Sequence, residues 1–158
     1  MTEVDTLADG LQDAFSGRDP AAFAAVCALD VHYEDPLCAR PLESVGALGD
    51  HIERLWTAFP DARMEAAGAR LHDDRFAALP VKLLAHHRGE LPELPPTDRF
   101  VVVHGVFYCE LTDDRETLWR IRAVFDLYDA AVQLGVIPKP GSAGERAMLL
   151  LRGFGLRR

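Results

Sequence analysis

The sequence predicts an α+β fold in which helices lead into an antiparallel sheet. Apolar residues recur at helical spacing through the first 60 residues or so, whereas the chain from about Arg63 to Asp126 is typical of strands joined by polar turns. Two consecutive hairpins in this second part imply antiparallel pairing. With 158 residues the chain has the length of one ordinary domain, so we expect a single domain over residues 1–158.

Helical periodicity predicts three helices before the sheet. They cover Val4 to Phe15, residues 20–28, and Ala47 to Phe59, the last being followed directly by Pro60. Between the second and third helices, residues 31–36 are predicted to form a short strand closed by a proline. The chain therefore reaches its main sheet only after residue 60 or so.

The strands of the sheet are apolar runs bounded by polar turns. They are predicted at residues 63–71, 76–87, 99–111 and 118–126. The proline-rich stretch 91–96 is expected to connect two strands, because proline fits neither a helix interior nor a central strand. A capping-box pattern over Ser142 to Glu145 precedes the apolar run Met148 to Leu151 and predicts a final helix.

Composition argues against several classes of partner. Seventeen basic and 25 acidic side chains give a net charge of −8, which disfavours nucleic acid and anionic membranes. No apolar run is long enough to cross a bilayer, and the acidic start lacks the pattern of a secretory signal, so we expect a cytoplasmic protein. The three cysteines lack the spacing of a zinc site or a disulfide scaffold and are expected to be reduced.

Strand alternation predicts which face of the sheet each histidine lies on. His87 shares a face with Val81 and is expected to point inward, whereas His86 points to the opposite face and meets solvent. Joint metal coordination by this adjacent pair is therefore disfavoured, and we expect no metal. His104 interrupts an apolar strand and shares a face with Tyr108. For His87 and His104 alike, a purely structural role is an equal alternative.

Asp126 is the strongest candidate for a catalytic residue. It lies between Phe125 and Leu127, and a carboxylate in such surroundings loses hydration and can take and return a proton. The alternative is that Asp126 caps a helix that begins near Tyr128. Alternation also places Asp126 on the same strand face as Arg122, which favours an outward position unless the strand is curved or bulged. No nucleophile elbow, P-loop or dinucleotide fingerprint is present, so proton transfer remains as the chemistry.

The segment VFDLYDAAVQLGVIP, residues 124–138, resembles the closing signature of SnoaL-like polyketide cyclases, a family of the nuclear-transport-factor-2-like superfamily. Further resemblances follow in the family's order at residues 33–36, 59–61 and 87–97. The resemblance implies a cone-shaped α+β barrel, in which a curved antiparallel sheet and its helices surround a pocket.

The resemblance also implies a reaction. Cyclases of the family close a ring of a polyketide ester by intramolecular aldol addition without a cofactor, and Asp126 matches their acid/base aspartate. We expect His87 and His104 to orient the substrate and polarise its carbonyl. A small hydrophobic or aromatic substrate is expected to contact a mostly aromatic set of residues: Tyr33, Asp35, Trp56, Phe59, Tyr108 and Phe125. Departures from the family pattern, among them Asp98 where glycine is usual, leave the substrate open.

Two other functions remain open at this point. Epoxide opening would require a second carboxylate or a tyrosine near Asp126, for which Asp35 and Tyr33 are the candidates. A non-catalytic small-molecule binding protein is favoured if the pocket is apolar and Asp126 is a helix cap. We also expect a homodimer, because the outer sheet face and the apolar segment Met148 to Leu156 would otherwise leave apolar surface exposed.

Overall fold

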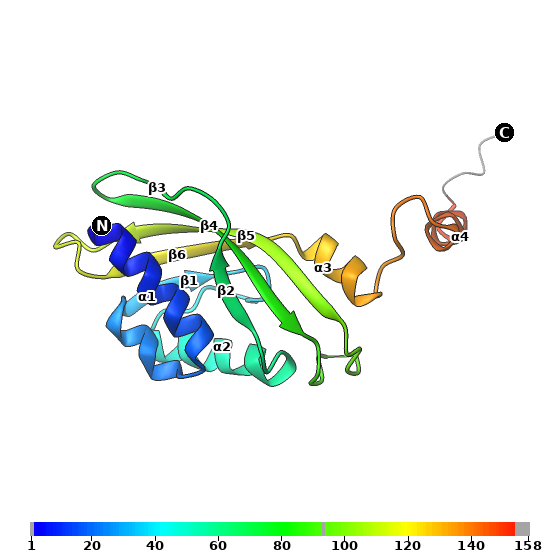
Figure 1. Cartoon of the computed structure of the whole chain (residues 1–158), viewed down its shortest axis with the longest axis horizontal. Helices are drawn as coiled ribbons and strands as arrows, with labels where there is room; N and C mark the ends of the chain where they lie inside the picture. The colour runs from blue at the N-terminus through cyan, green and yellow to red at the C-terminus, as the bar shows by residue number, and fades with distance from the viewer. Residues whose placement is uncertain (1, 93, 154–158) are drawn as a thin grey trace.

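The computed structural model describes residues 2–92 and 94–153, and it has the predicted α+β architecture. Figure 1 shows a strongly curved sheet with two helices, α1 and α2, near one end and the C-terminal helices beyond the other. The strand order in the sheet is β1-β6-β5-β4-β2, with β3 pairing β4. All pairs are antiparallel except β1 with β6, which is parallel, so the expectation of a purely antiparallel sheet was wrong at this edge.

The helices before the sheet follow the predicted pattern with one correction. Helix α1 (Glu3–Gly17) and helix α2 (Val45–Ala58) lie where apolar periodicity placed them. The segment predicted as a helix over residues 20–28 is instead a short 3-10 helix, η1 (Pro20–Ala25). It ends early because Cys27 already pairs with Leu118 as the first residue of β1. Pairing across the sheet thus replaces the last predicted helical turn.

The strands of the sheet lie close to their predicted positions. Their bounds are β1 (Cys27–Glu34), β2 (Arg63–Ala66), β3 (Leu71–His72), β4 (Phe76–His86), β5 (Phe100–Leu111) and β6 (Leu118–Phe125). The segment predicted as one strand over residues 63–71 is divided into β2 and β3, which pair with two different parts of the long strand β4. Pro80 lies between these two parts of β4. Its carbonyl accepts from Ala67 N, but proline has no N–H to donate to the neighbouring strand, so the pairing is interrupted there.

Alternation along β5 separates the two faces of the sheet. Val101, Phe107 and Cys109 are buried on the concave face, whereas Val106 and Tyr108 are exposed on the convex face. The buried side chains of the concave face join the apolar faces of α1 and α2 in one hydrophobic core. Burial of this apolar surface is the main stabilising contribution to the fold.

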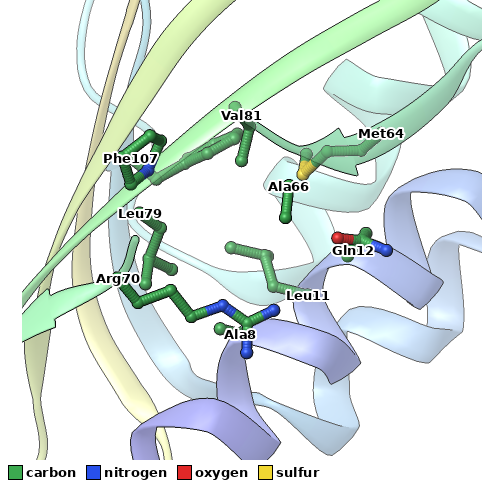
Figure 2. A pocket seen from close by; sticks show the side chains of 10 residues that line it. Ala8, Leu11, Gln12, Met64, Ala66, Arg70, Leu79, Val81 and Phe107 are labelled. Carbon is green, nitrogen blue, oxygen red and sulfur yellow. The ribbon is translucent and has the colours of Figure 1, made fainter. Parts of the chain in front are cut away.

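Helix α1 packs tightly on the sheet. Figure 2 shows Ala8 and Leu11 of α1 facing Met64, Leu79 and Phe107 of the sheet. The space left between them is only about 10 Å³, enough for about one water molecule. This crevice is therefore a packing contact and not a ligand site.

The C-terminal part contains two helices, α3 (Leu127–Leu134) and α4 (Ala143–Leu151). The side-chain amide of Gln133 holds α3 on β5, because it accepts a hydrogen bond from Val102 N and donates one to Val102 O, each 2.8 Å long. Helix α4, the predicted final helix, stands away from the sheet and has no buried residue (Figure 1). The expected apolar segment beyond Gly153 lies outside the described residues. Within those residues, no helix combines the length and apolarity needed to cross a membrane.

Candidate functional site

A cavity of about 250 Å³ lies between the concave face of the sheet and helices α2 and α3. Its wall is almost entirely apolar and includes Ile52 of α2, Leu83 of β4, Val103 of β5 and Leu134 of α3. The volume is near the lower end of the range for small-molecule pockets, roughly 300 Å³. Such a space suits a compact and largely apolar ligand.

Strand alternation and helix packing direct these side chains inward. Leu83 and Ala85 are two residues apart in β4, as are Val101 and Val103 in β5, so each pair faces the cavity. Phe125, at the end of β6, packs edge-on against Phe107 at a ring-centroid distance of 5.6 Å. The cavity is thus an extension of the hydrophobic core that the side chains leave unfilled.

Within the described part of the chain, Asp35 and Tyr33 are the polar residues of this wall. Asp35 follows β1 directly, and its Oδ2 accepts hydrogen bonds from the Tyr33 hydroxyl at 2.9 Å and from Nε2 of His51, in α2, at 2.8 Å. Its Oδ1 accepts from the backbone N–H groups of Leu37 and Cys38 at 2.7 and 3.1 Å. The side chain is only 5% exposed, so these four donors replace water around the carboxylate.

These contacts shift the protonation equilibria of the pair. Burial by itself would raise the pKa of Asp35, but the hydrogen bonds and charge of His51, with the donors Tyr33 and Leu37 N–H, outweigh it and hold that pKa below its usual value. Burial first, and then the charge of Asp35, raises the pKa of Tyr33 well above its ordinary value. At neutral pH the site therefore presents a carboxylate and a neutral phenol.

Cys38 adjoins the same group of residues. Its Sγ lies 3.7 Å from Nε2 of His51, and burial raises the pKa of its thiol. Asp35, Cys38 and His51 each offer one donor atom within 4.8 Å of the others. They come from the end of β1, the turn after it and α2.

Asp126 occupies the position that the helix-cap alternative predicted. It is the N-cap of α3, and its Oδ1 accepts a hydrogen bond from Asp129 N at 2.9 Å. Its neighbours Phe125 and Leu127 line the cavity, whereas Asp126 is exposed and is not part of the wall. The β-strand ends at Phe125, and the change to helical geometry turns the carboxylate toward the α3 backbone.

His87 is fully buried on the inward side of the sheet, as strand alternation predicted. Its Nδ1 accepts a hydrogen bond from Thr97 N at 3.2 Å, which assigns the ring proton to Nε2 in the neutral form. Among the residues that the structure describes, none is a hydrogen-bond partner of Nε2, and the ring packs on Phe59 with 5.2 Å between centroids. Phe59 lines the cavity and His87 lies behind it, next to the wall.

The other expected site residues divide between wall, core and outer surface. Tyr33, Asp35, Phe59 and Phe125 are in the cavity wall. Trp56 is buried in the core, where its Nε1 donates to Phe15 O at 3.0 Å. His104 and Tyr108 are exposed on the convex face of β5, because alternation along that strand gives the concave face to residues of odd number. The structure does not bring these two together with the cavity.

Sequence reasoning missed His51 and Cys38 as partners of Asp35. For His51 a signal was present, since residue 51 falls between Leu48 and Leu55 on the apolar face predicted for α2. A histidine on such a face needs a polar partner once it is buried. For Cys38 no comparable pattern exists, because its contact depends on the turn after β1.

Comparisons with known proteins agree with this architecture. A family model described as SnoaL-like polyketide cyclase matches residues 5–134. A search of curated proteins found no match. Among solved structures, AclR of Streptomyces galilaeus, described as a candidate hydroxylase, is similar with a TM-score of 0.74 at 20% identity, over 96% of this chain and 92% of that one.

Two further solved structures have the same fold. IdmH of Streptomyces antibioticus, described as a candidate polyketide cyclase, has a TM-score of 0.72 at 19% identity, over 85% of this chain and 99% of its own. A SnoaL-like protein of Jannaschia sp. CCS1 has a TM-score of 0.74 at 14% identity, over 86% and 94%. At these identities the likeness establishes the fold.

Proposed function

Because the chain belongs to the SnoaL-like polyketide cyclase family, we propose that it closes a ring in a compact aromatic polyketide ester, with Asp35 as the acid/base group. The observation that carries this proposal is that Asp35 is the carboxylate of the cavity wall, which apart from it and Tyr33 is apolar among the residues that the structure describes. Asp126, which matches the acid/base aspartate of the family, caps α3 instead.

The proposed reaction needs one modest base. Asp35 would take a proton from a carbon flanked by two carbonyl groups, and the resulting enolate would attack an internal carbonyl carbon to form the new C–C bond. The alkoxide so formed would then recover the proton from Asp35. A C–H group between two carbonyls is unusually acidic, so a weak base suffices. Because four donors occupy the lone pairs of Asp35, the Tyr33 hydroxyl would have to turn away from Oδ2 before Asp35 takes the proton.

Other residues of the cavity would support this step without touching the reacting carbon. His51 would act as a positioning residue, since its Nε2 lies 2.8 Å from Asp35 Oδ2 and fixes the carboxylate. The apolar wall would exclude water, which strengthens electrostatic interactions inside the cavity.

The test compares two aspartates in matched substitutions. With an aromatic methyl ester bearing a β-dicarbonyl side chain as the probe, ring closure is followed by chromatography and mass spectrometry. We expect Asp35→Asn to lower turnover by roughly 10²- to 10⁴-fold, the scale of positioned acid/base catalysis. Asp126→Asn keeps a capping side chain and should retain most of the turnover. Loss of turnover in Asp126→Asn together with normal turnover in Asp35→Asn would assign the base to Asp126.

The second candidate is non-catalytic binding of a small apolar molecule. It is favoured by the apolar wall and by the capping position of Asp126. Binding of the same probe, measured by calorimetry, without any turnover by the wild type would support it over cyclisation. Epoxide opening has less support, because it was expected to pair Asp35 or Tyr33 with Asp126, and Asp126 caps α3 and is not among the described residues of the wall.

A further inference from the structure

The donor atoms of Asp35, Cys38 and His51 converge on one point beside the cavity. Each side chain offers one atom, and all three atoms lie within 4.8 Å of one another. The Oδ2–Nε2 distance is 2.8 Å, and the Sγ–Nε2 distance is 3.7 Å. Oxygen, sulfur and imidazole nitrogen are the three kinds of protein ligand that zinc takes.

The way these side chains meet argues against a thiol nucleophile. In a nucleophile–histidine–carboxylate triad, the nucleophile and the carboxylate contact different nitrogens of the ring. Here Cys38 and Asp35 both face Nε2 of His51. Three donor atoms grouped on one side of the ring, each near the other two, can instead surround a shared ion.

The spacing of the donors is close to that of a tetrahedral site. With zinc–ligand bonds of about 2.0 to 2.3 Å, neighbouring donor atoms lie roughly 3.3 to 3.6 Å apart. The Sγ–Nε2 distance of 3.7 Å already has this size. The Asp35–His51 pair, at 2.8 Å, would have to open by about half an ångström, a shift that side-chain rotation can supply.

The surroundings of Asp35 hold this ligand in place. Leu37 N and Cys38 N donate to Oδ1, and the Tyr33 hydroxyl donates to Oδ2. Such contacts orient metal ligands and are part of a functional metal site. The carboxylate and a Cys38 thiolate would together balance the two positive charges of the ion, which a mostly buried position requires.

We propose that Asp35, Cys38 and His51 bind Zn²⁺ with one further coordination position open to water or to a ligand oxygen. On binding, the Cys38 thiol would release its proton to solvent, and His51 Nε2 would give up its proton so that its lone pair faces the ion and any remaining ring proton is on Nδ1. The ion would take the place of the Asp35–His51 hydrogen bond. Three protein ligands and one open position are the pattern of zinc sites that also bind small molecules.

Zinc binding here depends on donor geometry and not on whether Asp35 acts as a base, so it goes beyond the proposed function. A bound ion would occupy the lone pairs with which Asp35 would accept a proton. Metal binding and the acid/base role therefore exclude each other at any one moment, and a measurement of binding alone separates the two proposals.

The experiment titrates tag-free protein, treated with chelator and then freed of it, with ZnCl₂ in a calorimeter and with CoCl₂ in a spectrophotometer. We expect one ion per chain, together with a near-ultraviolet charge-transfer band from Cys38 to Co²⁺ and visible bands of tetrahedral Co²⁺. Cys38→Ser and His51→Gln should each abolish the stoichiometric binding, and Cys38→Ser should remove the charge-transfer band. Circular dichroism checks that both variants are folded.

His86→Ala is the matched control. His86 Nδ1 lies 2.6 Å from Asp61 Oδ2, so this variant removes a histidine–carboxylate pair that has no thiol beside it. This variant should bind the ion as the wild type does. The proposal is overturned if the wild type binds no stoichiometric Zn²⁺, if Co²⁺ binds without the thiolate band, or if His86→Ala loses the site while Cys38→Ser and His51→Gln keep it.

Discussion

His51 Nε2 lies 2.8 Å from Asp35 Oδ2, across 16 positions of sequence, and so joins helix α2 to the end of β1 at the cavity wall. Both side chains are largely buried, with 13% of His51 and 5% of Asp35 exposed. The contact orients the carboxylate that lines the cavity. We expect it to contribute to the free energy of unfolding.

Replacement of His51 by alanine should destabilise the protein. The change leaves the buried carboxylate of Asp35 without one of its donors, which costs roughly 1–3 kcal/mol of the free energy of unfolding. Urea denaturation measures the interaction energy between the two side chains. It compares the wild type with Asp35→Ala, His51→Ala and the double variant Asp35→Ala/His51→Ala. An interaction energy of about 0.5–3 kcal/mol is expected, whereas additive effects would contradict a direct contact. His72→Ala, an exposed histidine on β3, is the control.

The capping role of Asp126 predicts different results for two substitutions at one position. Asp126→Ala removes the acceptor of Asp129 N and should lower the free energy of unfolding by about 1 kcal/mol. Asp126→Asn keeps an acceptor, and its stability in urea should be close to that of the wild type. Equal destabilisation by both substitutions would show that the negative charge, and not the cap geometry, is what matters.

Gln133 should control how firmly α3 closes the cavity. Its amide makes two hydrogen bonds to the backbone of Val102, each 2.8 Å long. Gln133→Ala leaves these backbone groups without protein partners and should cost roughly 1–3 kcal/mol of stability. Hydrogen exchange measured by mass spectrometry should then increase over α3. Unchanged exchange in α3 would mean that apolar packing alone holds this helix.

Gly105 allows the Phe125 ring to sit against the sheet. A Cβ at this position would lie 2.3 Å from Phe125 Cδ1 and 2.6 Å from Val124 O. Gly105→Ala should therefore displace a ring of the cavity wall and destabilise the protein by about 1–3 kcal/mol in thermal or urea unfolding.

Gly46→Ala is the matched control for this substitution. Gly46 lies in α2, and outside its own helix backbone and chain neighbours no atom of the described residues lies within 4 Å of its Cβ position, so alanine should raise stability by up to about 1 kcal/mol. Equal destabilisation of both variants would refute the proposed close approach at Gly105.

We also propose that the protein is a homodimer through the convex face of its sheet. Val106 and Val124 pair across β5 and β6 on this face, and both are exposed. Adjacent exposed apolar side chains of this kind favour association between copies. Sedimentation at micromolar concentration should show a dimer, and Val124→Lys should convert it to a monomer. Leu29→Lys, at an exposed position on β1, is the control. A monomeric wild type would rule out the proposal.

Helix α4 bears on this proposal because it does not cover its own sheet. None of its residues is buried, and Met148, Leu149 and Leu150 are exposed. The simplest alternative to a dimer was a final helix packed across the sheet of its own chain. The structure does not show that packing, so the apolar face of the sheet stays available to a partner.

Much of the fold could be predicted from local patterns. Helical periodicity predicted α1 and α2, and apolar runs between polar turns predicted β4, β5 and β6 to within about two residues. Alternation also predicted that His87 is buried and that His86 points away from it. These predictions succeeded because a side chain's position on a helix or strand depends on the regular geometry of its own element.

The functional site depends on contacts between residues of different helices and strands. The sequence by itself determined that Asp126 stands at a strand-to-helix junction between two apolar residues, and it left pocket and cap as alternatives. Only the tertiary structure decided that Asp126 caps α3 and that Asp35 meets His51 at the cavity. The physical reason is that the direction of a carboxylate at the end of a strand depends on the curvature of the sheet and on the helices packed against it. Contacts between residues far apart in the chain set both of these features.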